Sequence, residues 1–140
     1  MMLGLQGNMI ISPPGFVQMA GLAALSGSWD PVKSMAKIYK RRVEYVANRL
    51  DDLEGISCPK PEGAFYVWAD ISGLSESSLS FCADLLEKKK TVALSGSHFG
   101  PIGSSYIRLA LVKPMDILEE AMDRIELYIK ERAKYTPSFP

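Results

Sequence analysis

The spacing of apolar residues predicts four helices along this chain. Ser12 with Pro13, and Asp30 with Pro31, each precede apolar side chains that recur every three or four positions, and the same spacing follows Leu79 and Asp116. Such spacing gathers the apolar side chains into one stripe of a helix. The second and longest stripe consists of Val32, Met35, Tyr39, Val43, Val46, Leu50 and Leu53. We expect the first helix to end at Gly27 and the second at Gly55.

Three other segments have the composition of strands. Residues 64–71 alternate aromatic with small side chains, and residues 106–111 are apolar except for one arginine. Residues 91–94, Thr-Val-Ala-Leu, form a short segment that begins with two β-branched residues. A glycine- and serine-rich loop, residues 95–104, joins the last two. The order is helix, helix, strand, helix, strand, strand, helix, without an internal repeat. This order predicts an α+β fold in which helices flank a small sheet.

The N-terminal end of the chain differs from the rest in charge. No Asp, Glu, Lys or Arg occurs from Met1 to Trp29. A membrane span would need about twenty unbroken apolar residues, but Pro13, Pro14 and Gly15 interrupt this segment. A secretory signal would need a basic start, which is missing. We therefore expect no membrane partner, and we expect residues 1–29 to pack against protein that lies outside this chain.

Composition narrows the classes of partner. Sixteen basic and sixteen acidic residues balance, so no basic surface favours nucleic acid, and small molecules or proteins remain as partners. Cys58 and Cys82 lack the spacing of a metal site, and the chain has one histidine. We expect two buried free thiols, no metal, and an intracellular, cytoplasmic location.

The pattern of residues alone, without any resemblance to a family, indicates one candidate site residue, Arg108. It interrupts an apolar strand, and a buried guanidinium requires an anion because it cannot lose its proton. One interpretation is an arginine that points to solvent or to a nearby glutamate. The other is an anion clamp in a small-molecule pocket with Phe65 and Tyr66 as apolar walls. His98 has no readable catalytic partner, so we predict no catalytic residue in this chain.

The loop before Arg108 also allows two interpretations. Its Gly and Ser residues could turn backbone N–H groups toward an anion. However, the loop precedes a strand, whereas phosphate-binding loops precede a helix, so a plain turn is favoured.

Three segments together resemble one known family. They are residues 5–8 through 12–14 followed by Gln18 and residues 20–25, residues 61–68 (Pro-Glu-Gly-Ala-Phe-Tyr-Val-Trp), and residues 99–100 with 106–109 (Phe-Gly, then Tyr-Ile-Arg-Leu). In this order they resemble the C-terminal portion of class I and II aminotransferases, the fold type I pyridoxal-phosphate enzymes of the aspartate aminotransferase superfamily.

The resemblance implies a function and two site residues. Arg108 would bind the α-carboxylate of an amino acid or 2-oxo acid substrate, and Phe65 would line the active site. Residues 1–29 would be a remnant of the large cofactor domain of an α/β parent. Residues 30–140 would be its small domain, with a long bridging helix at the start, and the parent would be a homodimer.

The family's lysine that binds pyridoxal phosphate, and most other cofactor ligands, correspond to positions upstream of Met1. The resemblance therefore implies a fragment of a transaminase that binds no cofactor covalently and is inactive alone. The alternative is a stand-alone, non-catalytic binding or regulatory module derived from the small domain. An arginine that dicarboxylate-specific relatives carry before the paired prolines is absent from residues 3–12, so specificity for aspartate by that device is not expected.

Overall fold

The chain divides into two compact units, Met1–Met35 and Ala36–Pro140, in a computed structural model that describes residues 2–10, 12–75 and 77–135. The first unit contains two helices, α1 (Met2–Met9), which the apolar spacing did not predict, and α2 (Gly15–Ser26). Neither helix has a buried residue. The predicted start of α2 at Pro13 is wrong by two residues, because Pro14 has an extended conformation at φ −54° and ψ 145°.

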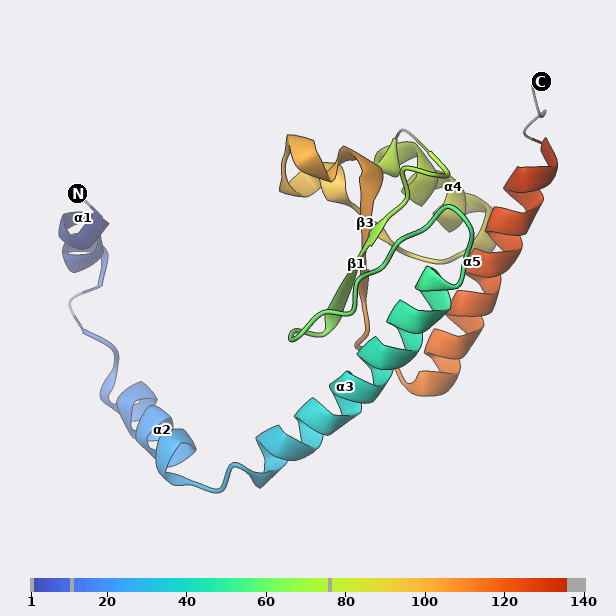
Figure 1. Ribbon diagram of the computed structural model, residues 1–140. Helices are drawn as coiled ribbons and strands as arrows, with labels where there is room; N and C mark the ends of the chain where they lie inside the picture. Colours follow the sequence, from blue (N-terminus) through green and yellow to red (C-terminus); the bar gives the residue numbers. More distant parts are fainter. Residues whose placement is uncertain (1, 11, 76, 136–140) are drawn as a thin grey trace. The chain divides into compact units, whose positions relative to one another are not determined.

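The helix α3 (Asp30–Asp51) begins at the predicted Asp30 and crosses the division between the two units. The second unit continues with β1 (Tyr66–Asp70), α4 (Ser78–Lys89), β2 (Leu94–Ser95), the 3-10 turns η1 (Gly96–Phe99) and η2 (Pro101–Ser105), β3 (Tyr106–Ala110) and α5 (Met115–Tyr135) (Figure 1). The predicted α+β class, a small sheet flanked by helices, is confirmed. Assignment of residues 1–29 and 30–140 to a large and a small domain stays a prediction.

Three antiparallel strands form the sheet in the order β1-β3-β2, so β3 is central. Arg108 on β3 lies opposite Trp68 on one side and Leu94 on the other. Both edge strands differ from their predicted bounds. β1 starts at Tyr66 because Ala64 has a φ of 65°, outside the β region. β2 starts at Leu94 because the Thr91 amide still bonds to the Leu85 carbonyl at the end of α4.

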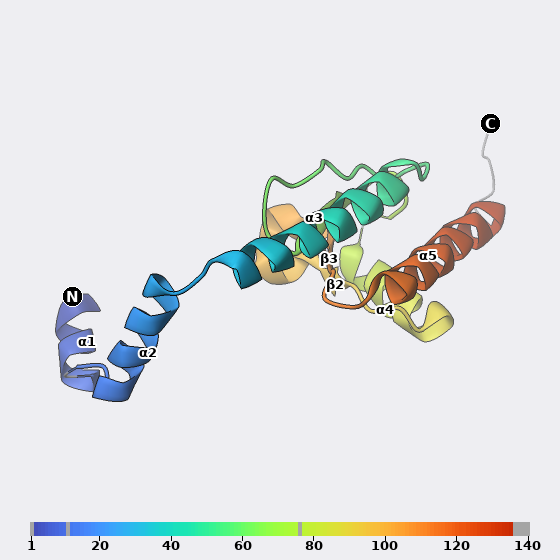
Figure 2. The same ribbon diagram turned by 90° about the horizontal axis from the view of Figure 1, so that it is seen from below.

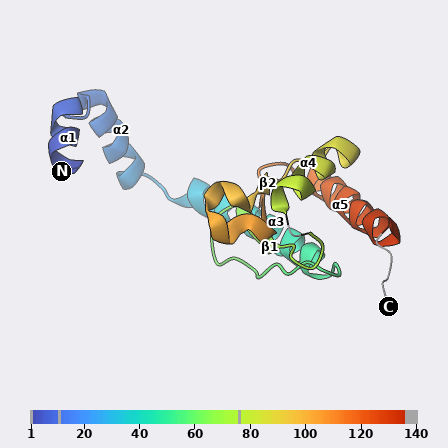
Figure 3. The same cartoon turned by 90° about the horizontal axis from the view of Figure 1, so that it is seen from above.

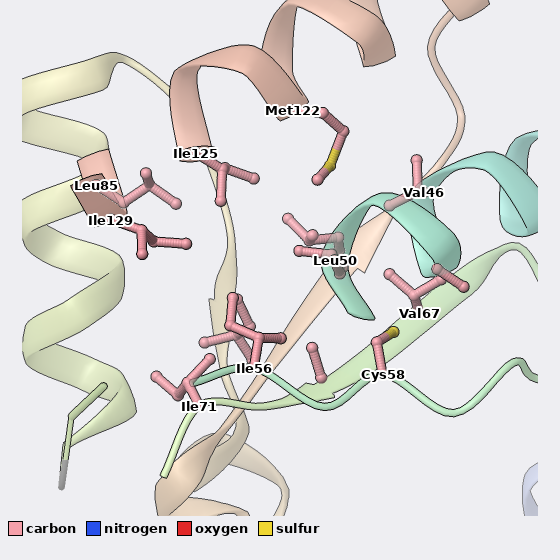
Figure 4. Close-up of a cluster of buried hydrophobic side chains, with 14 of the residues drawn as sticks. Val46, Leu50, Ile56, Cys58, Val67, Ile71, Leu85, Met122, Ile125 and Ile129 are labelled. Atoms are coloured by element: carbon pink, nitrogen blue, oxygen red, sulfur yellow. The ribbon is translucent and has the colours of Figure 1, made fainter. Parts of the chain in front are cut away.

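One face of the sheet packs on the helices of the second unit. Figure 4 shows Val46 and Leu50 from α3, Leu85 from α4, and Met122, Ile125 and Ile129 from α5 gathered over Val67 and its neighbours. Side chains that alternate along β1 and β3 complete this core: Val67, Ala69, Ile71, Ile107, Leu109 and Leu111. Each fully buried aliphatic side chain contributes about 1.5–3 kcal/mol to folding. The core therefore fixes which residues of β3 face inward.

α4 and α5 lie beside each other (Figures 1 and 3). The Tyr128 hydroxyl on α5 donates to the Asp84 carboxylate on α4 at 3.2 Å. η1 contacts both α4 and β3, and the orange turns are visible next to the strands in Figure 2. Cys58 and Cys82 are buried and free, as predicted. None of the described helices is both long and apolar enough to span a lipid bilayer.

Candidate functional site

The sheet face opposite the core carries aromatic and charged side chains. Along β1 and β3 the buried residues alternate with partly exposed ones, and the latter include Tyr66 and Trp68 on β1 and Tyr106 and Arg108 on β3. Successive side chains of a strand point to opposite faces, so these four share one face. The same alternation that builds the core therefore places Arg108 on this open face.

Arg108 is held against two aromatic rings. Its guanidinium carbon Cζ lies 4.4 Å from the centroid of the Tyr66 ring and 4.5 Å from that of Phe99. Its Nε is buried and has no hydrogen-bond partner, alone in this respect among the side-chain atoms of the described residues. Within that part of the chain no carboxylate forms an ion pair with it. A guanidinium with a dry, unpaired donor is poised to bind an anion.

Phe65, the other predicted site residue, belongs to the same aromatic group. Its ring centroid is 4.3 Å from that of Tyr66 and 5.4 Å from that of Tyr39 on α3. The Phe65 carbonyl accepts a hydrogen bond of 2.9 Å from the Leu111 amide, which fixes the backbone just before β1. The structure thus connects Phe65 to Arg108 through the Tyr66 ring.

Sequence reasoning missed the contact that Phe99 makes. Phe99 comes from η1, its ring lies 5.5 Å from the Trp68 ring in an edge-to-face arrangement, and 53% of the residue is exposed. Trp68 in turn stacks on Tyr106 at 5.7 Å. The available signal was a large aromatic residue inside a glycine- and serine-rich loop.

The loop that carries Phe99 is folded into two 3-10 turns, and the prediction of a plain loop is corrected accordingly. Gly96 and Gly103 meet backbone to backbone, so a Cβ on either would overlap the carbonyl oxygen of the other. The Ser95 hydroxyl is 2.7 Å from both the Ser78 and Ser97 hydroxyls, which links the turn to α4. Only glycine permits this close approach, and it sets the position of Phe99.

Two ionisable groups lie near the end of this face. The Asp70 carboxylate accepts a 2.8 Å hydrogen bond from the Ser72 amide, and this bond, with the Ser72 and Tyr106 hydroxyls, lowers its pKa. The Asp70 charge raises the pKa of the Tyr106 hydroxyl. His98 lies in η1 with Nδ1 3.2 Å from the Ser95 carbonyl oxygen, in keeping with a turn residue.

Two cavities lie in the second unit. A groove of about 470 Å³ runs along Arg108–Leu111 and α5, and a hollow of about 550 Å³ lies between α3 and residues 60–64. Neither is lined by Tyr66 or Phe99. The two rings that contact the Arg108 guanidinium therefore lie outside the lining of both cavities.

Comparison with known proteins adds an independent line of evidence. The model of the family "Aminotransferase class I and II" matches residues 1–125. An aspartate aminotransferase of Pyrococcus horikoshii is 43% identical over 113 residues, which cover 79% of this chain and 29% of that protein. Aromatic-amino-acid aminotransferase 2 of Thermococcus litoralis is 38% identical, with coverage of 86% and 31%.

A solved structure, an aromatic aminotransferase from Pyrococcus horikoshii, matches 94% of this chain and 36% of its own with a TM-score of 0.86 and 34% identity. The chain thus spans about a third of the length of the proteins it matches.

Proposed function

Because this chain belongs to the class I and II aminotransferase family, we propose that it forms part of a pyridoxal-phosphate-dependent aminotransferase. That enzyme moves an amino group from an amino acid to a 2-oxo acid, and Arg108 binds the α-carboxylate of both substrates. The unpaired, buried Nε of Arg108 beside two aromatic rings carries this proposal. A carboxylate can accept from Nε and a terminal nitrogen at once, which satisfies the orphaned donor and fixes the substrate's orientation.

The cofactor belongs to the part of the parent enzyme outside this chain. When bound, pyridoxal phosphate carries the amino group between the two substrates. The groups that contact the Arg108 guanidinium are aromatic rings, which offer pyridoxal phosphate neither an amine nor a phosphate ligand. We propose that this polypeptide alone does not transaminate, because the resemblance implies that the lysine that binds pyridoxal phosphate is not in it. The homodimeric, cytoplasmic parent stays a prediction.

Phe65 serves as an apolar wall of the site in this proposal. Its ring is held by Tyr66 and Tyr39, so it presents a fixed surface rather than a freely rotating side chain. Phe65→Leu in the parent should alter the ratio of kcat/KM values between substrates with large and small apolar side chains. The preference for substrates over amines that lack the carboxylate should not change, because Arg108 is untouched.

The decisive experiment replaces Arg108 in the full-length parent. Arg108→Ala should lower kcat/KM in both half-reactions by roughly 30- to 5,000-fold, since truncating one partner of a buried charged pair costs about 2–5 kcal/mol. The slow reaction of a matched amine without a carboxylate should be unaffected. Arg41→Ala is the control variant, because Arg41 is exposed on α3 and forms no described ion pair.

Ordinary activity of the Arg108→Ala parent toward both substrates would remove the assignment. For the chain alone, pyridoxal phosphate followed by borohydride should leave no stoichiometric label on a specific lysine. Such a label together with transaminase turnover would show that the chain binds the cofactor and is active by itself.

A further inference from the structure

Two aromatic rings from distant parts of the chain meet at one guanidinium. Tyr66 comes from β1 and Phe99 from η1, and the Arg108 Cζ lies within 4.5 Å of each ring centroid. We propose that Tyr66 and Phe99 are positioning residues for carboxylate binding, which act through Arg108 by holding its guanidinium in one place. This inference rests on the proposed function of Arg108 and adds two residues to it.

Phe99 does not take part in the packing of the core. With 53% of its surface in solvent, Phe99 lies outside the buried core, yet the ring is turned onto Trp68 and Arg108. An aromatic face attracts a cation through its quadrupole. The contact with Arg108 is therefore the interaction that this exposed ring gains.

The two rings also leave the donors of Arg108 unpaired. A ring face accepts no strong in-plane hydrogen bond, so the guanidinium is fixed while its Nε stays without a partner. The carboxylate on the same face, Asp70, is engaged by the Ser72 amide and the Tyr106 hydroxyl and forms no ion pair with Arg108. Because aromatic rings and not a carboxylate hold the guanidinium, its N–H donors remain available to an incoming anion.

The position of Phe99 is built into the loop. The backbone contact between Gly96 and Gly103 joins the two 3-10 turns, and the hydroxyl chain through Ser78 and Ser95 ties them to α4. A Cβ on Gly96 would also lie 2.7 Å from the Tyr106 carbonyl oxygen and 3.0 Å from the Trp68 ring. These contacts hold the turn against the sheet, and the ring of Phe99 is set by them.

Contact with the two rings reduces the conformational entropy that the Arg108 side chain loses when substrate binds. An arginine side chain without such contacts samples many rotamers, and each must be given up to form a two-point contact. The rings fix the guanidinium before the substrate arrives. Loss of a ring should therefore weaken binding of the carboxylate while leaving the bond-making groups of the enzyme intact.

The first test uses the 140-residue chain and nuclear magnetic resonance of the Arg108 Nε–Hε group. In the unaltered chain the rings should shift the Hε resonance upfield. Phe99→Leu and Tyr66→Leu should each move it downfield, whereas Tyr66→Phe, which keeps the ring, should not. Ile102→Ala is the matched control, because Ile102 lies in the neighbouring turn and is 91% exposed. An unchanged resonance in both leucine variants overturns the proposal.

The second test uses the full-length parent. Each leucine variant should raise KM for the amino acid and the 2-oxo acid by about two- to fivefold, and the double variant by about 5- to 30-fold, with a smaller change in kcat. Tyr66→Phe should retain the ordinary KM, which a purely structural role of the hydroxyl would not allow. An unaltered KM in the double variant refutes the positioning role.

The two tests separate this inference from the proposal on which it rests. If Arg108→Ala abolishes carboxylate selectivity but the double leucine variant has an ordinary KM, Arg108 binds substrate without the help of the rings. If the rings shift the Hε resonance but Arg108→Ala remains fully active, the arrangement of rings is real and the substrate role of Arg108 is wrong. Either outcome rejects the positioning role as stated.

Discussion

Replacing Arg108 by leucine should change the free energy of unfolding of this chain very little, although the same change should disable the parent enzyme. Two opposing contributions determine the result. The substitution removes two partly exposed cation–π contacts, worth about 0.5–1 kcal/mol each. It also removes a buried donor without a partner, whose burial costs about 1–3 kcal/mol. The expected net effect lies between about 1 kcal/mol of destabilisation and about 2 kcal/mol of stabilisation.

The assay is urea unfolding of the 140-residue chain followed by far-ultraviolet circular dichroism. Leu50→Ala is the reference variant, because Leu50 is fully buried in the core and its truncation should cost about 2–5 kcal/mol. A loss of more than about 3 kcal/mol for Arg108→Leu, similar to that of the core variant, would refute the reasoning. It would show that Arg108 stabilises the fold and does not serve as an unpaired donor for an anion.

The remaining predictions concern buried thiols, the loop and acid stability. Burial raises the pKa of the Cys58 and Cys82 thiols to about 11 each, so their alkylation at pH 8 should be slow in the native chain and fast in urea. The stability that these two neutral thiols contribute should be complete below about pH 8.5 and should fall as the pH rises toward 11. Gly103→Ala should lower the free energy of unfolding by about 2–3 kcal/mol, because its Cβ overlaps a facing carbonyl, and calorimetry would measure this. The hydrogen bond from Lys88 lowers the pKa of Asp84, so its stabilising effect is present above about pH 4 and lost as pH falls through the folded value. Asp84→Asn should flatten the acid limb of the stability profile, and an unchanged limb would contradict this.

Several elements could be read from sequence because their signals are local. The helix from Asp30 was predicted from its apolar stripe and from the proline at its second position. In the structure the C-terminal half of the stripe, with Val43, Val46 and Leu50, is buried, whereas Val32 and Met35 are exposed. The strand around Arg108 was predicted to within one residue for a similar reason, since its neighbours are apolar. The bounds of the edge strands were predicted less accurately. For β1 the reason is that Ala64 adopts a left-handed conformation, which cannot be predicted from composition.

The candidate site was only partly visible in the sequence. Arg108 stood out as a permanent charge in an apolar strand, and Phe65 entered through the resemblance of its segment to a family. Phe99 was missed because its distance from Arg108 depends on a backbone contact between two glycines, Gly96 and Gly103. That contact joins residues seven positions apart through turns that no periodicity describes.

The sequence by itself determined the class of the fold and the identity of the candidate anion-binding arginine, because apolar periodicity and a permanent charge both follow from residue type. Only the tertiary structure decided what surrounds that arginine. The register of β3 between β1 and β2 turns Arg108 away from the core, and the folded loop returns Phe99 to it. Ring contacts of this kind arise from three-dimensional proximity, and the linear order of residues does not contain them.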